Sequence, residues 1–97
     1  MTQEIHRVRT GLMTHEIYLV TVHDFADPDV PTVRTYAYNA KWKAIRSGIK
    51  IINILFDTEP GKVRKELIQT FENDTYTTAR TTNGDFYEIW MDQLVIE

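Results

Sequence analysis

The sequence predicts an α+β fold in which two helices cover one face of a mainly antiparallel β-sheet, in the order β-β-β-α-α-β-β. Three observations support this two-layer sandwich. Strand formers dominate up to residue 38, apolar residues recur at helical spacing over residues 39–74, and strand composition returns around an Asn-Gly pair. The 97 residues suit one small domain spanning 1–97, because domains usually hold about 100–200 residues.

Two strands, and a weaker third, are expected before the first helix. Residues 15–23 are rich in Ile, Val, Leu and Tyr, as a central strand is. Residues 4–10 form a weaker segment, separated by Gly11, that could pair with this strand as a hairpin. Residues 26–31 contain two prolines and two aspartates and predict a loop. The next strand, 32–38, places Arg34, Tyr36 and Tyr38 on one face.

The first helix is expected to begin after Asn39, whose side chain can cap free amides. Its predicted core stripe has spacings of three and four residues and comprises Trp42, Ile45, Ile49, Ile52 and Phe56. Ala44, Ile51 and Leu55 widen this stripe. Gly48 interrupts the pattern, because glycine costs about 1 kcal/mol against alanine inside a helix. The alternative is that the helix ends at Gly48 and residues 49–56 form a strand.

A second helix is expected after the Pro60-Gly61 pair, with Thr58 as its cap and Asn73-Asp74 at its end. Its predicted apolar stripe comprises Val63, Leu67, Ile68 and Phe71. Residues 75–82 then read as a threonine-rich strand. Asn83-Gly84 predicts a two-residue type I′ turn with both residues at positive φ. Residues 85–91 form the returning strand, which 94–96 could continue.

Charge is unevenly distributed along a chain whose formal net charge is −3. The net charge is −2 over residues 1–39, +5 over 40–65 and −6 over 66–97. One interpretation is that the helices simply expose Lys and Arg to solvent. The other is that the basic segment 41–65 meets an acidic partner. The proposed contact residues are Lys43, Arg46, Lys50, Arg64 and Lys65, with the hairpin aromatics Tyr87 and Trp90 as a further surface.

The residues that catalysis or cofactor binding would need are sparse. There is no cysteine, and Ser47, the one serine, lies in the predicted helix without a nucleophile-elbow motif. Gly61-Lys62 lacks the remainder of a phosphate-binding loop, because Val63 follows where Ser or Thr is required. A loop cluster of His23 with nearby aspartates lacks the pattern of a calcium loop. We therefore expect no enzymatic activity, no cofactor and no metal site.

The sequence thus favours a small binding protein: an inhibitor, adaptor or regulator of the kind that phages and mobile elements often encode. A protein partner is the leading hypothesis, and a homodimer stays open. The alternative is a nucleic-acid-binding accessory protein that uses Arg34, Tyr36, Tyr38 and Lys41, since basic and aromatic residues interleave there. No apolar stretch approaches the roughly 18–20 residues of a membrane span. The first twenty residues contain no signal-peptide core, so a cytoplasmic location is expected.

Overall fold

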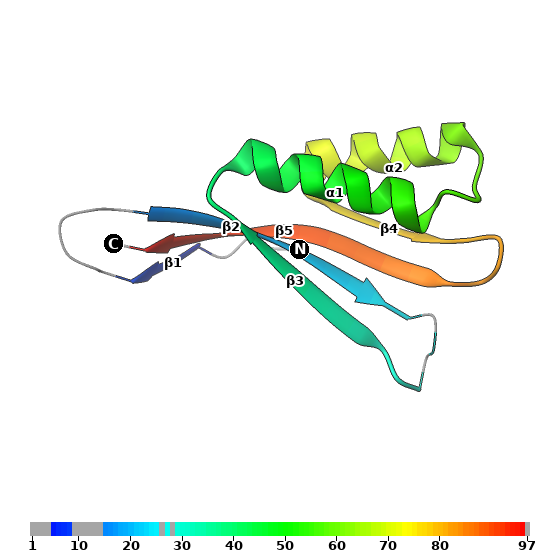
Figure 1. The fold of residues 1–97 in the computed structure, drawn as a ribbon, viewed down its shortest axis with the longest axis horizontal. Helices are drawn as coiled ribbons and strands as arrows, with labels where there is room; N and C mark the ends of the chain where they lie inside the picture. The colour runs from blue at the N-terminus through cyan, green and yellow to red at the C-terminus, as the bar shows by residue number, and fades with distance from the viewer. Residues whose placement is uncertain (1–4, 9–14, 26, 28, 97) are drawn as a thin grey trace.

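The computed structural model describes residues 5–8, 15–25, 27 and 29–96. Along the chain, three strands come first, two helices follow, and two more strands end the fold, which is the predicted α+β order (Figure 1). The elements are β1 (Ile5–Val8), β2 (His15–Asp24), β3 (Thr32–Tyr38), α1 (Lys41–Leu55), α2 (Gly61–Asp74), β4 (Tyr76–Arg80) and β5 (Phe86–Ile96). The segment 49–55 therefore continues α1 through Gly48, and the strand alternative for it is wrong.

The sheet is organised around β5, its longest strand. On one side β5 pairs antiparallel with β2, and β2 pairs antiparallel with β3. On the other side β5 pairs with β4 through residues 86–90 and, in parallel, with β1 through residues 93–96. The predicted hairpin between the first two strands does not form, because β5 and β3 occupy the two edges of β2. Residues 4 and 9–11 of that prediction lie outside the described part of the chain.

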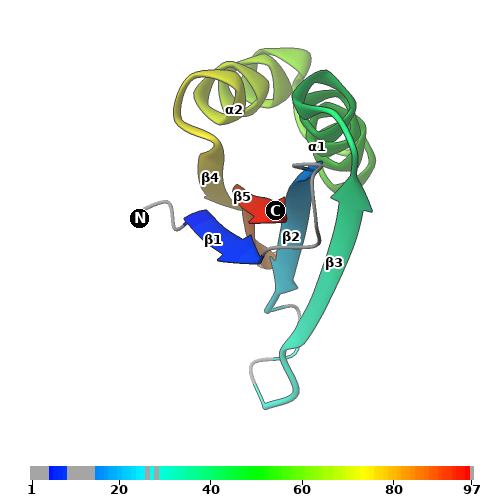
Figure 2. The ribbon, with the colours of Figure 1, turned by 90° about the vertical axis from the view of Figure 1, so that its left-hand side faces the viewer.

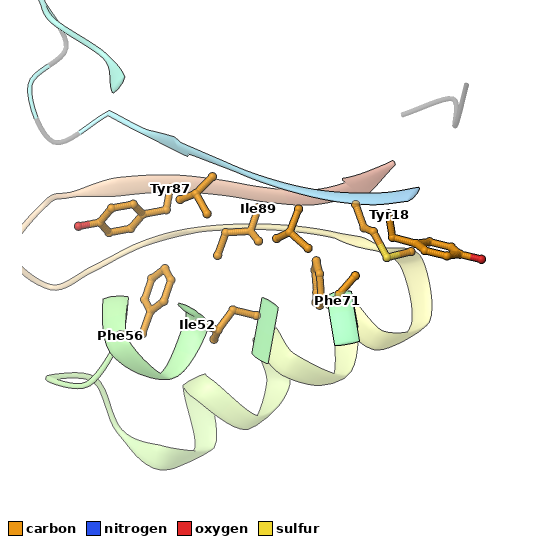
Figure 3. Close-up of a cluster of buried hydrophobic side chains, with 10 residues drawn as sticks. Tyr18, Ile52, Phe56, Phe71, Tyr87 and Ile89 are labelled. Carbon is orange, nitrogen blue, oxygen red and sulfur yellow. The ribbon is translucent and has the colours of Figure 1, made fainter. Parts of the chain in front are cut away.

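Both helices lie on the same face of the sheet, with α2 over β4 and α1 toward β2 and β3 (Figure 2). The core fills the space between these layers. Ile52 and Phe56 point from the helical layer toward Ile89 and Tyr87 on β5 (Figure 3). The rings of Phe56 and Tyr87 meet edge to face, with centroids 5.5 Å apart. Phe71, from α2, closes the same cluster.

The buried face of α1 differs from the predicted stripe. It runs through Ala44, Gly48 and Ile52 and continues to Phe56 just after the helix. Trp42, placed in the stripe by the sequence, is 62 % exposed. Small residues line the buried face because α2 approaches closely there. A Cβ atom added at Gly48 would lie 2.2 Å from Cε2 of Phe71, so the side chain of Phe71 occupies the space that a larger residue would need.

Neither helix uses its predicted cap. Ala40 occupies the N-cap of α1, and the Asn39 side chain accepts a hydrogen bond from Lys43 Nζ at 3.1 Å instead. Pro60 occupies the N-cap of α2, two residues after Thr58. Glu59 is buried, and its carboxylate accepts hydrogen bonds from Thr82 N at 2.5 Å and Thr82 Oγ1 at 2.9 Å. This contact ties the loop between the helices to the β4–β5 hairpin.

The β4–β5 hairpin forms as predicted, but its turn is of another type. Thr81 N donates to Asp85 O at 2.8 Å, which leaves a three-residue loop, 82–84. Gly84 has a φ of 94°, whereas Asn83 is not among the described residues with positive φ. Gly84 N also donates to Thr81 O at 2.9 Å. A turn followed by one left-handed glycine is the common three-residue hairpin loop. Thr82 of this loop is hydrogen-bonded to Glu59, an interaction that the local sequence does not reveal.

Candidate functional site

The solvent side of α1 carries a line of positive charge. Lys43, Arg46 and Lys50 are all exposed and follow one another at spacings of three and four residues. We call these three residues the cationic ridge. Helical geometry places them on neighbouring turns of one face. Lys41, the first residue of α1, lies two residues before the ridge, and no acidic residue occurs anywhere in α1.

An apolar patch lies beside the ridge, toward the start of the helix. Trp42, Ile45 and Ile49 line a shallow depression together with Lys41 and Arg46. The ammonium group of Lys43 lies 5.6 Å from the centroid of the Trp42 ring, a cation–π distance. Tryptophan and arginine are enriched at the centres of protein interfaces, so an exposed tryptophan with cations beside it is typical of a binding surface. The prediction that Trp42 faces the core is therefore wrong, whereas Ile45 is half-buried and also packs against the core, as predicted.

Arg64, predicted as part of the contact surface, is half-buried and bonded within the protein. Its Nη1 atom donates to Phe56 O and Asp57 O, each at 3.3 Å, and also to Glu59 O. A cation at this place stabilises carbonyls that are left free where a helix ends. Lys65, the next predicted contact residue, is exposed on α2. The structure therefore separates the two: Arg64 holds the loop between the helices, and Lys65 remains available.

This difference gives a testable expectation for stability. Arg64→Ala should lower the free energy of unfolding by about 1–3 kcal/mol, because the carbonyls that it satisfies lose a charged donor. Lys65→Ala, an equal truncation at an exposed neighbour, should change it by less than about 0.5 kcal/mol. Urea denaturation followed by circular dichroism measures both. Equal stability of the two variants would mean that Arg64 is not a structural residue.

Tyr87 and Trp90 do not form one surface, because they lie on opposite faces of β5. Tyr87 faces the helices and is 8 % exposed. Burial raises the pKa of Tyr87, and the nearby charges of Asp24 and Asp85 raise it further. Trp90 lies on the face away from the helices, where its Nε1 donates to Asp92 Oδ2 at 3.1 Å. Their separation by three residues, an odd number, already places them on opposite faces of a strand.

The sheet face opposite the helices carries an aromatic cluster with acidic neighbours. His23 stacks against Phe25 with ring centroids 3.9 Å apart, and Phe25 lies 5.4 Å from Phe86. Tyr76 donates its hydroxyl to Glu88 at 3.0 Å. Partial burial and this carboxylate together raise the pKa of Tyr76. Arg80 lies 5.5 Å from the centroid of the Phe86 ring, so the carboxylates of Glu88 and Asp92 share this face with one cation.

The residues of the nucleic-acid alternative lie on β3, on the face toward the helices. The hydroxyl of Tyr38 is hydrogen-bonded to Ser47 Oγ of α1, and its ring packs against the core. Arg34 and Tyr36 remain accessible, and Tyr36 is 40 % exposed. They line a groove of about 260 Å³ between β3 and α1, whose other wall includes Ile51, Ile54 and Leu55. Lys41 is set apart from this groove, beside Trp42.

Two further findings concern only the part of the chain that the structure describes. No group of three or more His, Cys, Asp or Glu side chains there converges as metal ligands would. Neither helix is both long and apolar enough to cross a bilayer. The hydroxyl of Ser47 contacts Tyr38, so it serves as a packing contact between α1 and β3.

Comparisons with known proteins add no functional information. No protein-family model, curated protein or solved structure matched the chain.

Proposed function

We propose that this chain is a small non-enzymatic binding protein, acting as an inhibitor, adaptor or regulator, that holds an acidic protein partner through its basic helical segment 41–65. The observation that carries the proposal is the outer surface of α1. Lys41, Lys43 and Arg46 lie beside a tryptophan that is 62 % exposed, Lys50 continues the ridge, and the helix contains no acidic residue. Such a surface offers an apolar anchor for binding energy and surrounding charge for orientation.

A protein partner is favoured over a nucleic acid by the distribution of charge. A nucleic acid presents a continuous line of phosphates, and binding requires several cations along its path. Here the cations are concentrated on the helical layer, while the opposite sheet face carries Glu88 and Asp92. Of the aromatic residues in the nucleic-acid alternative, Tyr38 is already bonded to Ser47. A compact acidic patch on a protein matches the limited extent of the ridge better.

The test reverses the ridge charges together: Lys43→Glu, Arg46→Glu and Lys50→Glu. These side chains are exposed, so the fold should survive, as circular dichroism would show. Binding of the partner, captured by cross-linking after nuclease treatment and identified by mass spectrometry, should weaken about tenfold or more. The partner is then titrated at about 0.1 M and 0.5 M salt, since higher salt screens exposed charges.

A matched control separates the ridge from net charge. Lys62→Glu, at an exposed position of α2 outside the ridge, makes the same change as the single ridge variant Lys43→Glu. Only the ridge variant should lose affinity. A folded triple variant that binds as tightly as the parent at low salt would contradict the proposal. Loss of the captured partner on nuclease treatment would favour the nucleic-acid alternative instead.

A further inference from the structure

The outer edge of the sheet at β3 is open to solvent. Among the strands that the structure describes, β3 pairs with β2 alone, so its second edge presents backbone donors and acceptors that no other described strand uses. Six of its seven residues are exposed, and only Tyr38 is half-buried. Proteins commonly protect such an edge with lysine, proline or a bulge. The segment Thr32–Tyr38 contains neither lysine nor proline, Arg34 is its one charged residue, and its pairing with β2 runs through seven consecutive residues without a bulge.

A groove runs beside this edge on the side of the helices. Ile51, Ile54 and Leu55 of α1 form one wall, and Thr32, Arg34 and Tyr36 of β3 form the other. Val22 and Asp24 of β2 also line it. Ile54 is 61 % exposed, an unusual position for an isoleucine beside a core. The start of β3 lies farther from α1 than the end of β3 does (Figure 1).

We propose that β3 and this groove bind an extended segment of the acidic partner by strand addition. The backbone of the segment would pair with the free edge of β3. Alternate side chains of an added strand point to the same face, so every second residue would face the groove and contact Ile51, Ile54 and Leu55. Pairing through the backbone supplies affinity, and the groove supplies selectivity for apolar residues at those positions.

The positive charge of α1 favours an acidic partner segment over a second copy of the chain as the strand that pairs with β3. Edge-to-edge pairing of two β3 strands would bring two α1 helices toward each other, each with a net charge of +4. Helical spacing places Lys50 one turn before Ile54, so the rim of the groove is basic. Arg34 lies within the groove, and Asp24 is the acidic group lining it. A segment with apolar residues at alternate positions and Asp or Glu between them matches this surface. The expectation that this segment is acidic rests on the proposed function, whereas the groove and the open edge of β3 do not depend on it.

The first experiment selects ligands directly. A library of random ten-residue peptides is displayed on phage and selected on the wild-type protein, with counter-selection on Ile54→Lys. That substitution removes the exposed apolar wall residue but adds positive charge. Enriched peptides should show alternating apolar residues with acids between them. A synthetic representative should bind Ile54→Lys at least tenfold more weakly than the wild type.

The second measurement detects strand pairing itself. In the free protein, alternate amides of β3 face solvent and should exchange quickly with deuterium. A bound peptide should protect those alternate amides, with a period of two residues, as read by NMR. Val63→Lys, at a position on α2 that is 38 % exposed, is the control and should leave peptide binding unchanged.

The outcomes separate this inference from the proposed function. If the ridge alone binds acidic chains, Ile54→Lys keeps or strengthens binding and the β3 amides stay unprotected, which overturns the groove proposal. If the groove binds and the ridge does not, Ile54→Lys abolishes binding, while the double reversal Lys43→Glu and Arg46→Glu, which keeps Lys50 at the rim of the groove, leaves it intact. Failure to enrich any peptide over the Ile54→Lys background would also overturn strand addition.

Discussion

Gly48→Ala should lower the free energy of unfolding by about 1–3 kcal/mol, even though alanine is the better helix former by about 1 kcal/mol. The added methyl group would lie 2.2 Å from Cε2 and 2.4 Å from Cζ of Phe71. The Phe71 ring is fully buried and cannot move aside without disturbing the core. Overpacking therefore outweighs the gain in helix propensity. Thermal unfolding should show a fall of about 4–8 °C for each kcal/mol lost.

Gly61→Ala is the matched control for this expectation. Gly61 begins α2, and a Cβ atom there would meet only Arg64 Nη2 at 3.7 Å, an ordinary contact. This variant should be as stable as the parent or slightly more stable, because alanine restricts the unfolded chain. If Gly48→Ala behaved like Gly61→Ala, the close approach of α1 and α2 would not exist in solution.

Ile52→Ala is expected to have the largest effect on stability, a loss of about 2–5 kcal/mol. Ile52 is 0 % exposed and packs between the helices and the sheet (Figure 3). Its truncation removes buried contacts and leaves a cavity that a small core cannot fill easily. This is a large share of the total, because domains are typically stable by only about 5–15 kcal/mol.

Ile54→Ala makes the same chemical change two residues later on the same helix. Because Ile54 is 61 % exposed, its truncation should alter the free energy of unfolding by less than about 0.5 kcal/mol. Urea unfolding of both variants, followed by tryptophan fluorescence, gives the comparison. An unchanged midpoint for Ile52→Ala would show that α1 does not turn this residue toward the sheet.

Local patterns in the chain were sufficient to predict the fold class. Runs of strand-forming residues indicated β2, β3 and β5, and helical spacing indicated α1 and α2. These patterns persist because each element must bury one face, whatever its partner is. The pairing of β1 with β5 was not predicted from the sequence. The two strands are about 88 residues apart along the chain, as the pairing of Ile5 with Gln93 shows. Non-local pairing of this kind leaves no mark in a short stretch of sequence.

The candidate site was predicted only in part, for a related reason. The cationic ridge followed from the spacing of Lys43, Arg46 and Lys50, since like residues on one helix face need no knowledge of neighbours. Arg64 looked equivalent in sequence, but the carbonyls that it contacts belong to the end of α1 and the loop after it. Whether a cation is free or bonded depends on what lies next to it in space.

The sequence by itself determined the class of fold, the element order and the concentration of positive charge on the helical segment. Only the tertiary structure decided which side of α1 is buried. The apolar residues of that helix cover more than one face, and periodicity alone pointed to Trp42. The contact between Gly48 and Phe71 draws α2 against the small-residue side and thereby turns Trp42 outward. That rotation creates the exposed anchor, because close packing between helices depends on the shapes of both surfaces.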